Sequence, residues 1–328
     1  MKYRSLGKTD WEVAEIGLGT WQIGGGWGNP FNPKIASEIL HKAFDKGVNF
    51  VDTADVYDAG ASEAAVGKAV RERSEKIYVA TKCGRRIHPH IDETYSVEKL
   101  RRHVEDSLRN TGLNRLDLIQ LHCPPTSVYQ RDEIFGLFEK LKTEGKIAAM
   151  GVSVEQVEEA KSAMEYEIVS CVQVIFNMFR QKPAEELFGI AAAKNVGLII
   201  RVPLASGLLS GKITKDTNFC HDDHRFFNRE GKAFDKGETF SGVPLVKAFP
   251  AVEELREIFK GDGALAAIAL RWILMYDEVS VVIPGASKAS QLEANVLAGE
   301  LARLSDEQMK GVKSIYDKYI REEVHGQW

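Results

Sequence analysis

Short apolar segments alternate with longer amphipathic segments along most of the chain. In the longer segments apolar residues recur every three or four positions, as Val97, Leu100, Val104 and Leu108 do, and this spacing predicts an amphipathic helix. The short segments are almost entirely apolar, which is typical of strands that are buried on both faces of a sheet. Parallel strands need a helix-length connection between them. The alternation therefore predicts a parallel sheet that is covered by helices.

Eight strand–helix pairs follow one another between residues 15 and 297. The strands are predicted at 15–19, a segment ending at 52, 77–81, 116–121, 147–151, 172–176, 197–202 and 279–283. The helices are predicted at 35–44, 62–70, 97–110, 132–143, 154–164, 184–194, 264–276 and 289–297. Eight such pairs predict closure into an α/β TIM (β/α)8 barrel, and the 328 residues are expected to form one domain.

Three segments lie outside this alternation. Residues 2–6 and 12–14 flank Gly7-Lys8-Thr9-Asp10, which is typical of an N-terminal β-hairpin. Residues 206–250 form a long loop after the seventh strand and are rich in Gly, Asp, Lys and Phe. A loop this long in a compact domain is usually functional, so a flap over the substrate or the cofactor is expected. Residues 305–319 carry apolar side chains at helical spacing and are predicted to pack outside the barrel.

The composition narrows the classes of protein. Apolar residues make up 44% of the chain, and the net charge is −4 with no long run of either sign. This balance gives no support to a nucleic-acid partner or to a basic membrane contact. No segment resembles a signal peptide or a membrane-spanning helix. The four cysteines are widely spaced, so a cytoplasmic protein with reduced thiols is expected. The sequence does not indicate the oligomeric state.

Three successive predicted strands lead into side chains that can hold or transfer a proton. The second strand ends at Asp52 and is followed by Tyr57, the third leads to Lys82 and the fourth to His122. In an α/β barrel, active sites are built at the C-terminal ends of the strands. These four residues are therefore the candidate catalytic group.

The four side chains suit the protonation of a carbonyl oxygen. An unperturbed tyrosine has a pKa of about 10, and the ammonium of Lys82 is expected to lower the pKa of Tyr57. Asp52 can balance the charge of a buried Lys82, and His122 can donate a hydrogen bond to a substrate oxygen. Taken singly, each residue could instead have a structural role, and Asp52 and Lys82 could form only an ion pair. Their joint position favours general acid catalysis.

Three segments resemble the signatures of the aldo-keto reductase family. They are Gly47-Val48-Asn49-Phe50-Val51-Asp52-Thr53-Ala54-Asp55-Val56-Tyr57, Leu116-Asp117-Leu118-Ile119-Gln120-Leu121-His122 and Ile283-Pro284-Gly285-Ala286-Ser287-Lys288. The resemblance extends from Tyr3 to about Leu297. It implies a TIM barrel that binds the nicotinamide cofactor NADP(H) without a Rossmann fold. It also implies that Tyr57 is the general acid, that Lys82 lowers its pKa and pairs with Asp52, and that His122 orients the carbonyl group.

The resemblance assigns three groups of cofactor-binding residues and a substrate pocket. At the nicotinamide the implied residues are Gly19, Thr20, Trp21, Asp52, Ser153, Gln173 and Arg201. At the pyrophosphate, where backbone N–H groups and a lysine can neutralise phosphate, they are Leu204, Ser206, Leu208, Gly211 and Lys212. At the adenosine and its 2′-phosphate they are Gly285, Ser287, Lys288, Gln291 and Asn295. The pocket walls are expected to include Trp21, Trp27, Val56, Tyr57, His122 and Cys123.

Four positions depart from the family pattern. Val154 stands where many members have asparagine, Cys123 where some have tryptophan, and Ala294 where glutamate is common. Arg201 stands where many members stack a tyrosine on the nicotinamide. A guanidinium can stack on a ring, but it places a positive charge beside a ring that is cationic when oxidised. Arg201 is therefore predicted to favour NADPH over NADP⁺, and hence reduction.

Two other functions are compatible with these residues. A metal-dependent barrel hydrolase could use His88, His90 and His122, although no metal site is expected. A cofactor-binding regulatory module is the second alternative, because the same fold serves as a redox-sensing subunit of potassium channels. The sequence favours an enzyme that uses NADPH to reduce aldehydes and ketones to alcohols. The substrate is expected to be a small carbonyl compound, and the sequence does not identify it.

Overall fold

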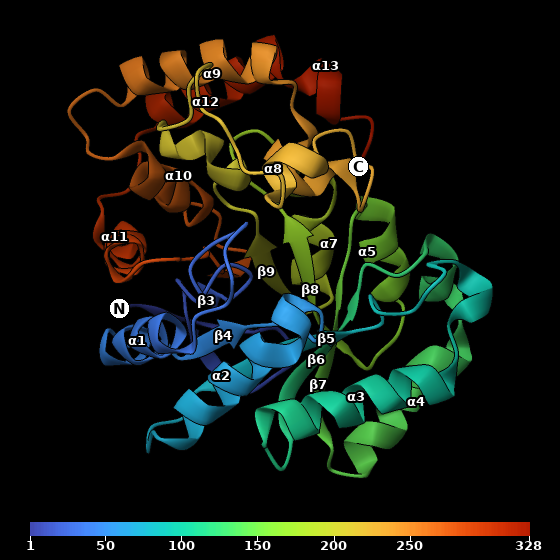
Figure 1. Cartoon of the computed structure of the whole chain (residues 1–328). Helices are drawn as coiled ribbons and strands as arrows, with labels where there is room; N and C mark the ends of the chain where they lie inside the picture. Colours follow the sequence, from blue (N-terminus) through green and yellow to red (C-terminus); the bar gives the residue numbers. More distant parts are fainter.

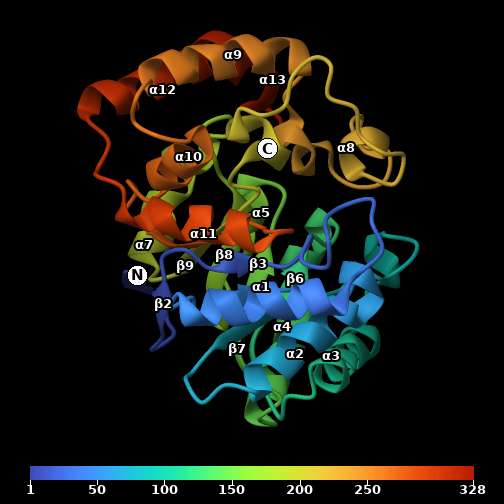
Figure 2. The same cartoon turned by 60° about the vertical axis from the view of Figure 1, so that its left-hand side comes forward.

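The computed structural model describes residues 1–328. Its centre is a barrel of eight parallel strands surrounded by helices (Figures 1 and 2). In spatial order the strands are β3 (Leu18–Gly19), β4 (Phe50–Asp52), β5 (Tyr78–Cys83), β6 (Leu116–His122), β7 (Ile147–Ser153), β8 (Val169–Ile175), β9 (Gly197–Arg201) and β10 (Val279–Val282). Backbone bridges from Ile16 to Val282 and from Gly19 to Gly285 close the barrel. The predicted TIM barrel is confirmed.

Helices on the outside of the barrel connect the strands. They are α1 (Pro33–Asp45), α2 (Ala61–Arg71), α3 (Val97–Thr111), α4 (Asp132–Thr143), α5 (Val157–Ala163), α6 (Lys182–Glu186), α7 (Phe188–Ala193), α10 (Leu265–Ile273) and α11 (Ala289–Leu297). Local sequence sets their limits. The Asn32 side chain accepts hydrogen bonds from two backbone N–H groups at the start of α1. Gly112, with a φ of 63°, ends α3 in the left-handed conformation that glycine adopts readily.

The interior of the barrel has an apolar layer below a polar one. The apolar layer joins neighbouring strands and two residues of the hairpin, and consists of Leu6, Val13, Phe50, Ala80, Leu118, Ala149, Cys171, Ile199, Val281 and Ile283. Alternate residues of a strand face the same side of the sheet. Two positions beyond the apolar layer, Lys82, Gln120 and Gln173 therefore also face the interior. The barrel thus presents polar side chains at the C-terminal ends of its strands above an apolar floor.

The expected N-terminal hairpin is confirmed and lies at the other end of the barrel. Its strands are β1 (Tyr3–Ser5) and β2 (Glu12–Ala14), which pair in antiparallel register. The guanidinium of Arg4 donates hydrogen bonds of 2.8 to 3.0 Å to the backbone oxygens of Leu274, Tyr276 and Val279. The hairpin therefore ties the N-terminal ends of the strands to the loop that precedes β10.

The segment after β9 contains helices that the sequence interpretation missed. It includes α8 (His224–Phe227), several single turns and the first residues of α9 (Leu245–Ile258). The expected irregular segment 206–250 is therefore too long, because α9 continues through Pro250 although proline usually interrupts a helix. Residues 206–244 are called the flap below. They lie over the C-terminal ends of the strands (Figure 1).

Other helix limits also differ from the expected ones. The helix predicted at 184–194 is divided into α6 and α7, and the helix predicted from residue 154 begins at Val157. The predicted helix at 305–319 is confirmed as α12 (Asp306–Tyr319), which packs beside α9 and is followed by α13 (Arg321–Val324) (Figures 1 and 2). None of the helices has both the length and the apolar character that a membrane span requires.

Candidate active site

The ammonium of Lys82 lies at the centre of the polar layer. Lys82 Nζ donates hydrogen bonds to Asp52 Oδ1, to the backbone oxygen of Thr53 at 2.9 Å and to the hydroxyl oxygen of Tyr57 at 3.2 Å. Its side chain is 1% exposed. Burial alone would lower the pKa of Lys82, but Asp52 and Tyr57 raise it above its ordinary value. The ammonium of Lys82 is therefore a fixed cation, and each of its three N–H groups has a hydrogen-bond acceptor.

Asp52 is held by three strands besides its own. Its second oxygen, Oδ2, accepts hydrogen bonds from Gln120 Nε2 at 3.1 Å and from Gln173 Nε2 at 2.8 Å. Gln173 Nε2 also lies 3.1 Å from Gln120 Oε1, so the two amides support each other. Both carboxylate oxygens of Asp52 are thus hydrogen-bonded, which keeps a buried anion in place. The amide N–H groups of Gln173, which is also implied to bind the nicotinamide, are engaged inside the barrel.

Tyr57 faces both Lys82 and His122. It opens a turn in which Asp58 and Ala59 have positive φ angles of 48° and 52°, and this turn returns the chain toward α2. The ring of Tyr57 lies edge-on to the His122 ring at 6.1 Å and stacks near Trp21 at 6.2 Å. The hydroxyl therefore lies beside a cation, and the ring that carries it lies beside an imidazole.

The expected fall in the pKa of Tyr57 is wrong for this structure. Burial raises the pKa of Tyr57 above its ordinary value, while Lys82 acts in the opposite direction and lowers it. The loss of solvent has the larger effect. The hydroxyl is consequently protonated at neutral pH and can act as a proton donor.

His122 ends β6 and is buried beside Tyr57. Burial lowers the pKa of His122 well below its ordinary value, and the cations Lys82, Arg85 and Arg201 lower it further. The imidazole is therefore neutral at neutral pH and carries one N–H group. Its Nδ1 atom is buried without a hydrogen-bond partner in the protein. A buried polar atom normally has a partner, so His122 is suited to hydrogen-bond a bound molecule.

A charged network that the sequence interpretation missed lies beside these residues. Arg85 Nη1 lies 3.2 Å from Glu155 Oε1, and Glu238 Oε1 lies 3.7 Å from Arg85 Nη2 and 3.6 Å from Arg201 Nη1. Arg201 also donates to the backbone oxygen of Val154 at 3.0 Å. Arg85 and Glu155 follow β5 and β7 closely, so their positions at strand ends were a usable signal. Glu238 comes from the flap, where no pattern indicated it.

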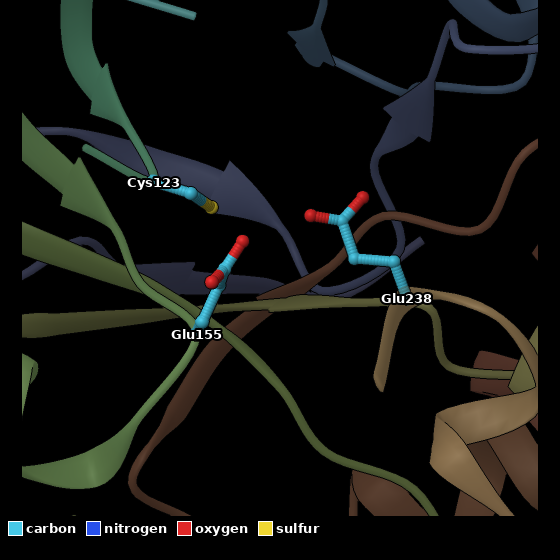
Figure 3. A group of neighbouring side chains, drawn as sticks. All are labelled: Cys123, Glu155 and Glu238. Atoms are coloured by element: carbon cyan, nitrogen blue, oxygen red, sulfur yellow. The ribbon is translucent and has the colours of Figure 1, made fainter. Parts of the chain in front are cut away.

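Cys123, Glu155 and Glu238 converge from separate segments, and their potential metal ligands lie within 4.8 Å of one another (Figure 3). Both carboxylates already face guanidinium groups, so the cluster is explained as two acids balanced by two cations, Arg85 and Arg201. Burial raises the pKa of the Cys123 thiol to about 12 and that of Glu155 to about 7. A protonated thiol is a poor metal ligand.

The histidines of the hydrolase alternative are not brought together as metal ligands. The ring nitrogens of His90 lie 3.0 Å from the backbone oxygen of Cys123 and 3.3 Å from the hydroxyl of Tyr95. Neither His88 nor His90 belongs to a group with metal-binding spacing. The geometry therefore gives that alternative no support.

A cavity of about 200 Å³ opens beside Tyr57. Four of the six expected pocket residues line it, namely Trp21, Trp27, Val56 and Tyr57. The flap adds Phe227, Phe234 and the carboxylate of Asp222, and the loop after Tyr57 adds the carboxylate of Asp58. His122 does not line it and lies edge-on to the Tyr57 ring, and Cys123 lies in the charged network. The lining of the cavity is thus mainly aromatic and includes two acidic residues.

The residues implied at the nicotinamide lie at strand ends around the barrel mouth. Gly19 donates its N–H to Pro284 at 3.1 Å, and a Cβ on Gly19 would lie 2.8 Å from the backbone oxygen of Ile283, so β3 and β10 approach closely there. The Thr20 hydroxyl bonds Ser62 at 2.8 Å and therefore points toward α2. Ser153 is buried, with its hydroxyl 3.7 Å from the sulfur of Cys123.

The residues implied at the pyrophosphate lie in the first part of the flap, except Leu204, which lies just before it. The Ser206 hydroxyl donates to the backbone oxygen of Glu238 and accepts from the N–H of Phe240, both at 3.1 Å. Leu208 is buried in the main core, the Gly211 oxygen accepts from Arg256, and Leu204 packs against the same core. Lys212 is exposed and has no ion-pair partner.

The residues implied at the adenosine end form a compact group at the start of α11. The N–H and hydroxyl of Ser287 lie 2.8 and 3.0 Å from Gln291 Oε1. Asn295 Nδ2 donates to the oxygen of Gly285 at 3.2 Å. Lys288 is exposed and directly precedes the first turn of α11. A lysine and the N–H groups of a helix start together suit an anion.

Comparisons with known proteins agree with this geometry. The model of the Aldo/keto reductase family matches residues 15–317. The Aldo-keto reductase YhdN of Bacillus subtilis (strain 168) is 31% identical over 335 residues, which cover 99% of this chain and 96% of the relative. The structure of the glycerol dehydrogenase AKR11B4 from Gluconobacter oxydans is 31% identical, with a TM-score of 0.78 and coverage of 97% and 96%. The NADH-specific methylglyoxal reductase of Escherichia coli (strain K12) is 27% identical, with coverage of 91% and 93%.

Lys82→Met is expected to lower the free energy of unfolding by about 3–5 kcal/mol, because it leaves the buried Asp52 carboxylate without its cation. Chemical denaturation at neutral pH measures the change. The double variant Asp52→Asn/Lys82→Met should lose less of its free energy of unfolding, because neither buried charge remains. A loss below about 1 kcal/mol, which is typical of exposed ion pairs, would contradict the buried pair.

Tyr57 in the cofactor-free protein is expected to ionise only above pH about 10, the ordinary tyrosine value, because burial raises its pKa. The ultraviolet absorbance change of tyrosinate formation, taken as the difference between the wild type and Tyr57→Phe during a pH titration, isolates this hydroxyl. Ionisation below pH about 9, a full unit under that ordinary value, would show that Lys82 outweighs burial.

Proposed function

Because the chain belongs to the aldo/keto reductase family, we propose that it reduces small aldehydes and ketones to alcohols with NADPH. The observation that carries this proposal is the position of Tyr57, whose hydroxyl lies 3.2 Å from Lys82 Nζ and whose ring lies edge-on to that of the neutral His122. The hydroxyl is a proton donor whose conjugate base lies next to a fixed cation. This arrangement fits a reaction in which a carbonyl oxygen gains a proton as its carbon gains a hydride.

Each catalytic side chain has a distinct role in the proposal. The bound cofactor would supply the hydride. Tyr57 donates its proton to the carbonyl oxygen, and the ammonium of Lys82 stabilises the phenolate that remains. His122 donates its N–H to the same oxygen and so orients the carbonyl group and stabilises its developing charge. Asp52 keeps Lys82 charged and in position, and takes no direct part in the proton transfer.

The residues around the barrel mouth fit a dinucleotide with phosphates. Lys212 and Lys288 are exposed cations without ion-pair partners, and Lys288 also directly precedes the first turn of α11, whose N–H groups can bind phosphate. The expected contacts at the nicotinamide are Gly19, Thr20, Trp21, Asp52, Ser153, Gln173 and Arg201. Those at the phosphates and adenosine are Leu204, Ser206, Leu208, Gly211, Lys212, Gly285, Ser287, Lys288, Gln291 and Asn295.

The proposed preference for NADPH rests on Ser287 and Lys288. An exposed lysine at the start of α11 can bind the 2′-phosphate that NADH lacks. One relative is named an NADH-specific methylglyoxal reductase, so membership of the family does not by itself imply NADPH. Arg201 contributes at the other end of the cofactor, although Glu238 balances part of its charge.

The cavity supports small, uncharged carbonyl compounds as substrates. Its volume of about 200 Å³ is below the range of roughly 300–1,000 Å³ that is typical of drug-sized ligands. Trp21, Trp27 and Phe234 offer apolar faces to a substrate chain or ring. Asp58 and Asp222 place negative charge in the wall, which disfavours keto acids and carbonyl compounds with phosphate groups.

Tyr57→Phe is expected to reduce the rate of carbonyl reduction by about 10²–10⁴-fold, the contribution typical of general acid catalysis. The affinity for NADPH should stay nearly unchanged, because the hydroxyl contacts the substrate rather than the cofactor. NADPH oxidation over a panel of aldehydes and ketones measures the first effect and a fluorescence titration measures the second. Tyr319→Phe, on α12 outside the barrel, serves as the matched control.

A loss below about tenfold in Tyr57→Phe, short of the general acid range, would place the proton donor elsewhere, with His122 as the next candidate. If the wild-type protein binds NADPH but turns over none of the panel by itself, the regulatory alternative is favoured instead.

Lys288→Ala is expected to weaken NADPH binding by about 10- to 100-fold, since a charge-assisted hydrogen bond contributes about 1.5–3 kcal/mol. NADH binding should hardly change, because NADH has no 2′-phosphate. Fluorescence titrations with both cofactors measure the difference, and Lys310→Ala, an exposed lysine on α12, is the control. Equal weakening of both cofactors would instead assign Lys288 to the pyrophosphate.

A further inference from the structure

The flap crosses the barrel mouth, where several contacts hold it, among them a hydrogen bond of 2.8 Å from Asn177 Nδ2 to the Ser241 hydroxyl. Two others lie next to the site. At the first, the His224 ring lies 4.7 Å from the ring of Trp21 and 4.1 Å from that of Trp27. At the second, Glu238 forms ion pairs with Arg85 and Arg201. The second contact lies next to the candidate catalytic residues. What holds Glu238 in that position is therefore relevant to the reaction.

Glu238 is the last residue of a single helical turn, and Asp235, which precedes this turn, is hydrogen-bonded to Trp328. The turn is η5 (Lys236–Glu238), and Asp235 caps it by accepting from the N–H of Gly237 at 2.7 Å. The indole Nε1–H of Trp328 lies 3.0 Å from each carboxylate oxygen of Asp235. Trp328 is 7% exposed, so this hydrogen bond is largely shielded from water.

The ring of Trp328 also packs directly against the backbone of the flap. A Cβ on Gly237 would lie 2.9 Å from an atom of this ring, and a Cβ on Gly242 would overlap it. Gly242 has a φ of 76°, a conformation that other residues rarely adopt. The two glycines, one within η5 and one beyond it, therefore leave room for the indole.

Arg180 connects the same indole to the barrel. The guanidinium carbon of Arg180 lies 4.1 Å from the ring centroid of Trp328, which is within the range of a cation–π contact. Arg180 Nη2 donates to the backbone oxygen of Glu155 at 2.8 Å, so its position is fixed by the loop after β7. Trp328 thus lies between a buried arginine of the barrel and the backbone of the flap. In Figure 1 the end of the chain, marked C, lies beside the flap.

We propose that Trp328 is a positioning residue for the flap: it holds 235–242 against Arg180 so that Glu238 stays paired with Arg85 and Arg201, and it thereby slows flap opening and release of the cofactor. This inference rests on the proposed function for its effect on NADPH. The anchoring of the flap itself does not depend on the cofactor. The two parts can therefore be tested separately.

Trp328→Ala is expected to accelerate NADPH dissociation by about 10- to 100-fold, the range that loss of a hydrogen bond to a carboxylate produces. Stopped-flow fluorescence measures the rate. The KM for NADPH should rise, while kcat should not fall, because the catalytic residues keep their contacts. Trp328→Phe keeps an aromatic ring on Arg180 but also loses the Nε1–H, so its effect should lie at the lower end of this range. Gln327→Ala, at an exposed neighbouring residue, is the matched control.

Limited proteolysis tests the anchor without cofactor. The flap contains Arg225 and Lys236, whose side chains are half-buried in the closed structure, and trypsin can cut after them once the segment opens. Trp328→Ala should be cut in the flap at least about tenfold faster than wild type, for the same loss of one charged hydrogen bond, while the barrel stays intact. Asp235→Ala should have the same effect, and the double variant should add little to either.

The outcomes separate the two proposals. Faster flap cleavage with no NADPH binding in any variant would keep the anchor and reject the proposed function. Unchanged cleavage and unchanged NADPH release in folded Trp328→Ala would overturn the anchor. If Trp328→Ala does not fold, Trp328→Phe decides, and wild-type rates of flap cleavage and NADPH release in this variant would overturn the anchor equally.

Discussion

The buried ion pair between Lys82 and Asp52 is the interaction on which the rest of the site depends. A charge removed from water costs several kcal/mol unless it is paired and hydrogen-bonded. Here the cation has three acceptors and the carboxylate has donors from Gln120 and Gln173. Because both charges are satisfied, the ammonium remains charged and can keep one N–H on the Tyr57 hydroxyl. The same pair therefore stabilises the polar interior and keeps a cation beside the Tyr57 hydroxyl.

These contacts join residues that are far apart in the sequence. Asp52 lies 30 residues before Lys82, 68 before Gln120 and 121 before Gln173. No local segment can hold this geometry, so it exists only after β4, β5, β6 and β8 lie in one closed barrel. Contacts of such long sequence separation form late and slowly in folding. Recovery of the complete site on refolding is thus a measure of barrel closure rather than of helix formation.

The barrel and the four candidate catalytic residues could be predicted because both follow regular spacing. Apolar segments repeat, and Asp52, Lys82 and His122 each stand where a predicted strand ends. The pKa of Tyr57 could not be predicted, since its direction depends on how far burial outweighs Lys82. Glu238 could not be predicted either, because the flap has no periodic pattern. The helix α9 was missed because Pro250 normally indicates the end of a helix and here lies inside one.

The ion pairs of Glu238 give the flap an electrostatic consequence at long range. When the flap is away from the barrel, Arg85 and Arg201 keep only Glu155 as a nearby counter-ion. The open mouth then carries a net positive charge in a low-dielectric cleft, which focuses the field outward and attracts anions from solution. A dinucleotide phosphate is such an anion. In the proposed opening of the flap, loss of Glu238 therefore strengthens the attraction for anions, and its return restores the balance of two acids and two cations.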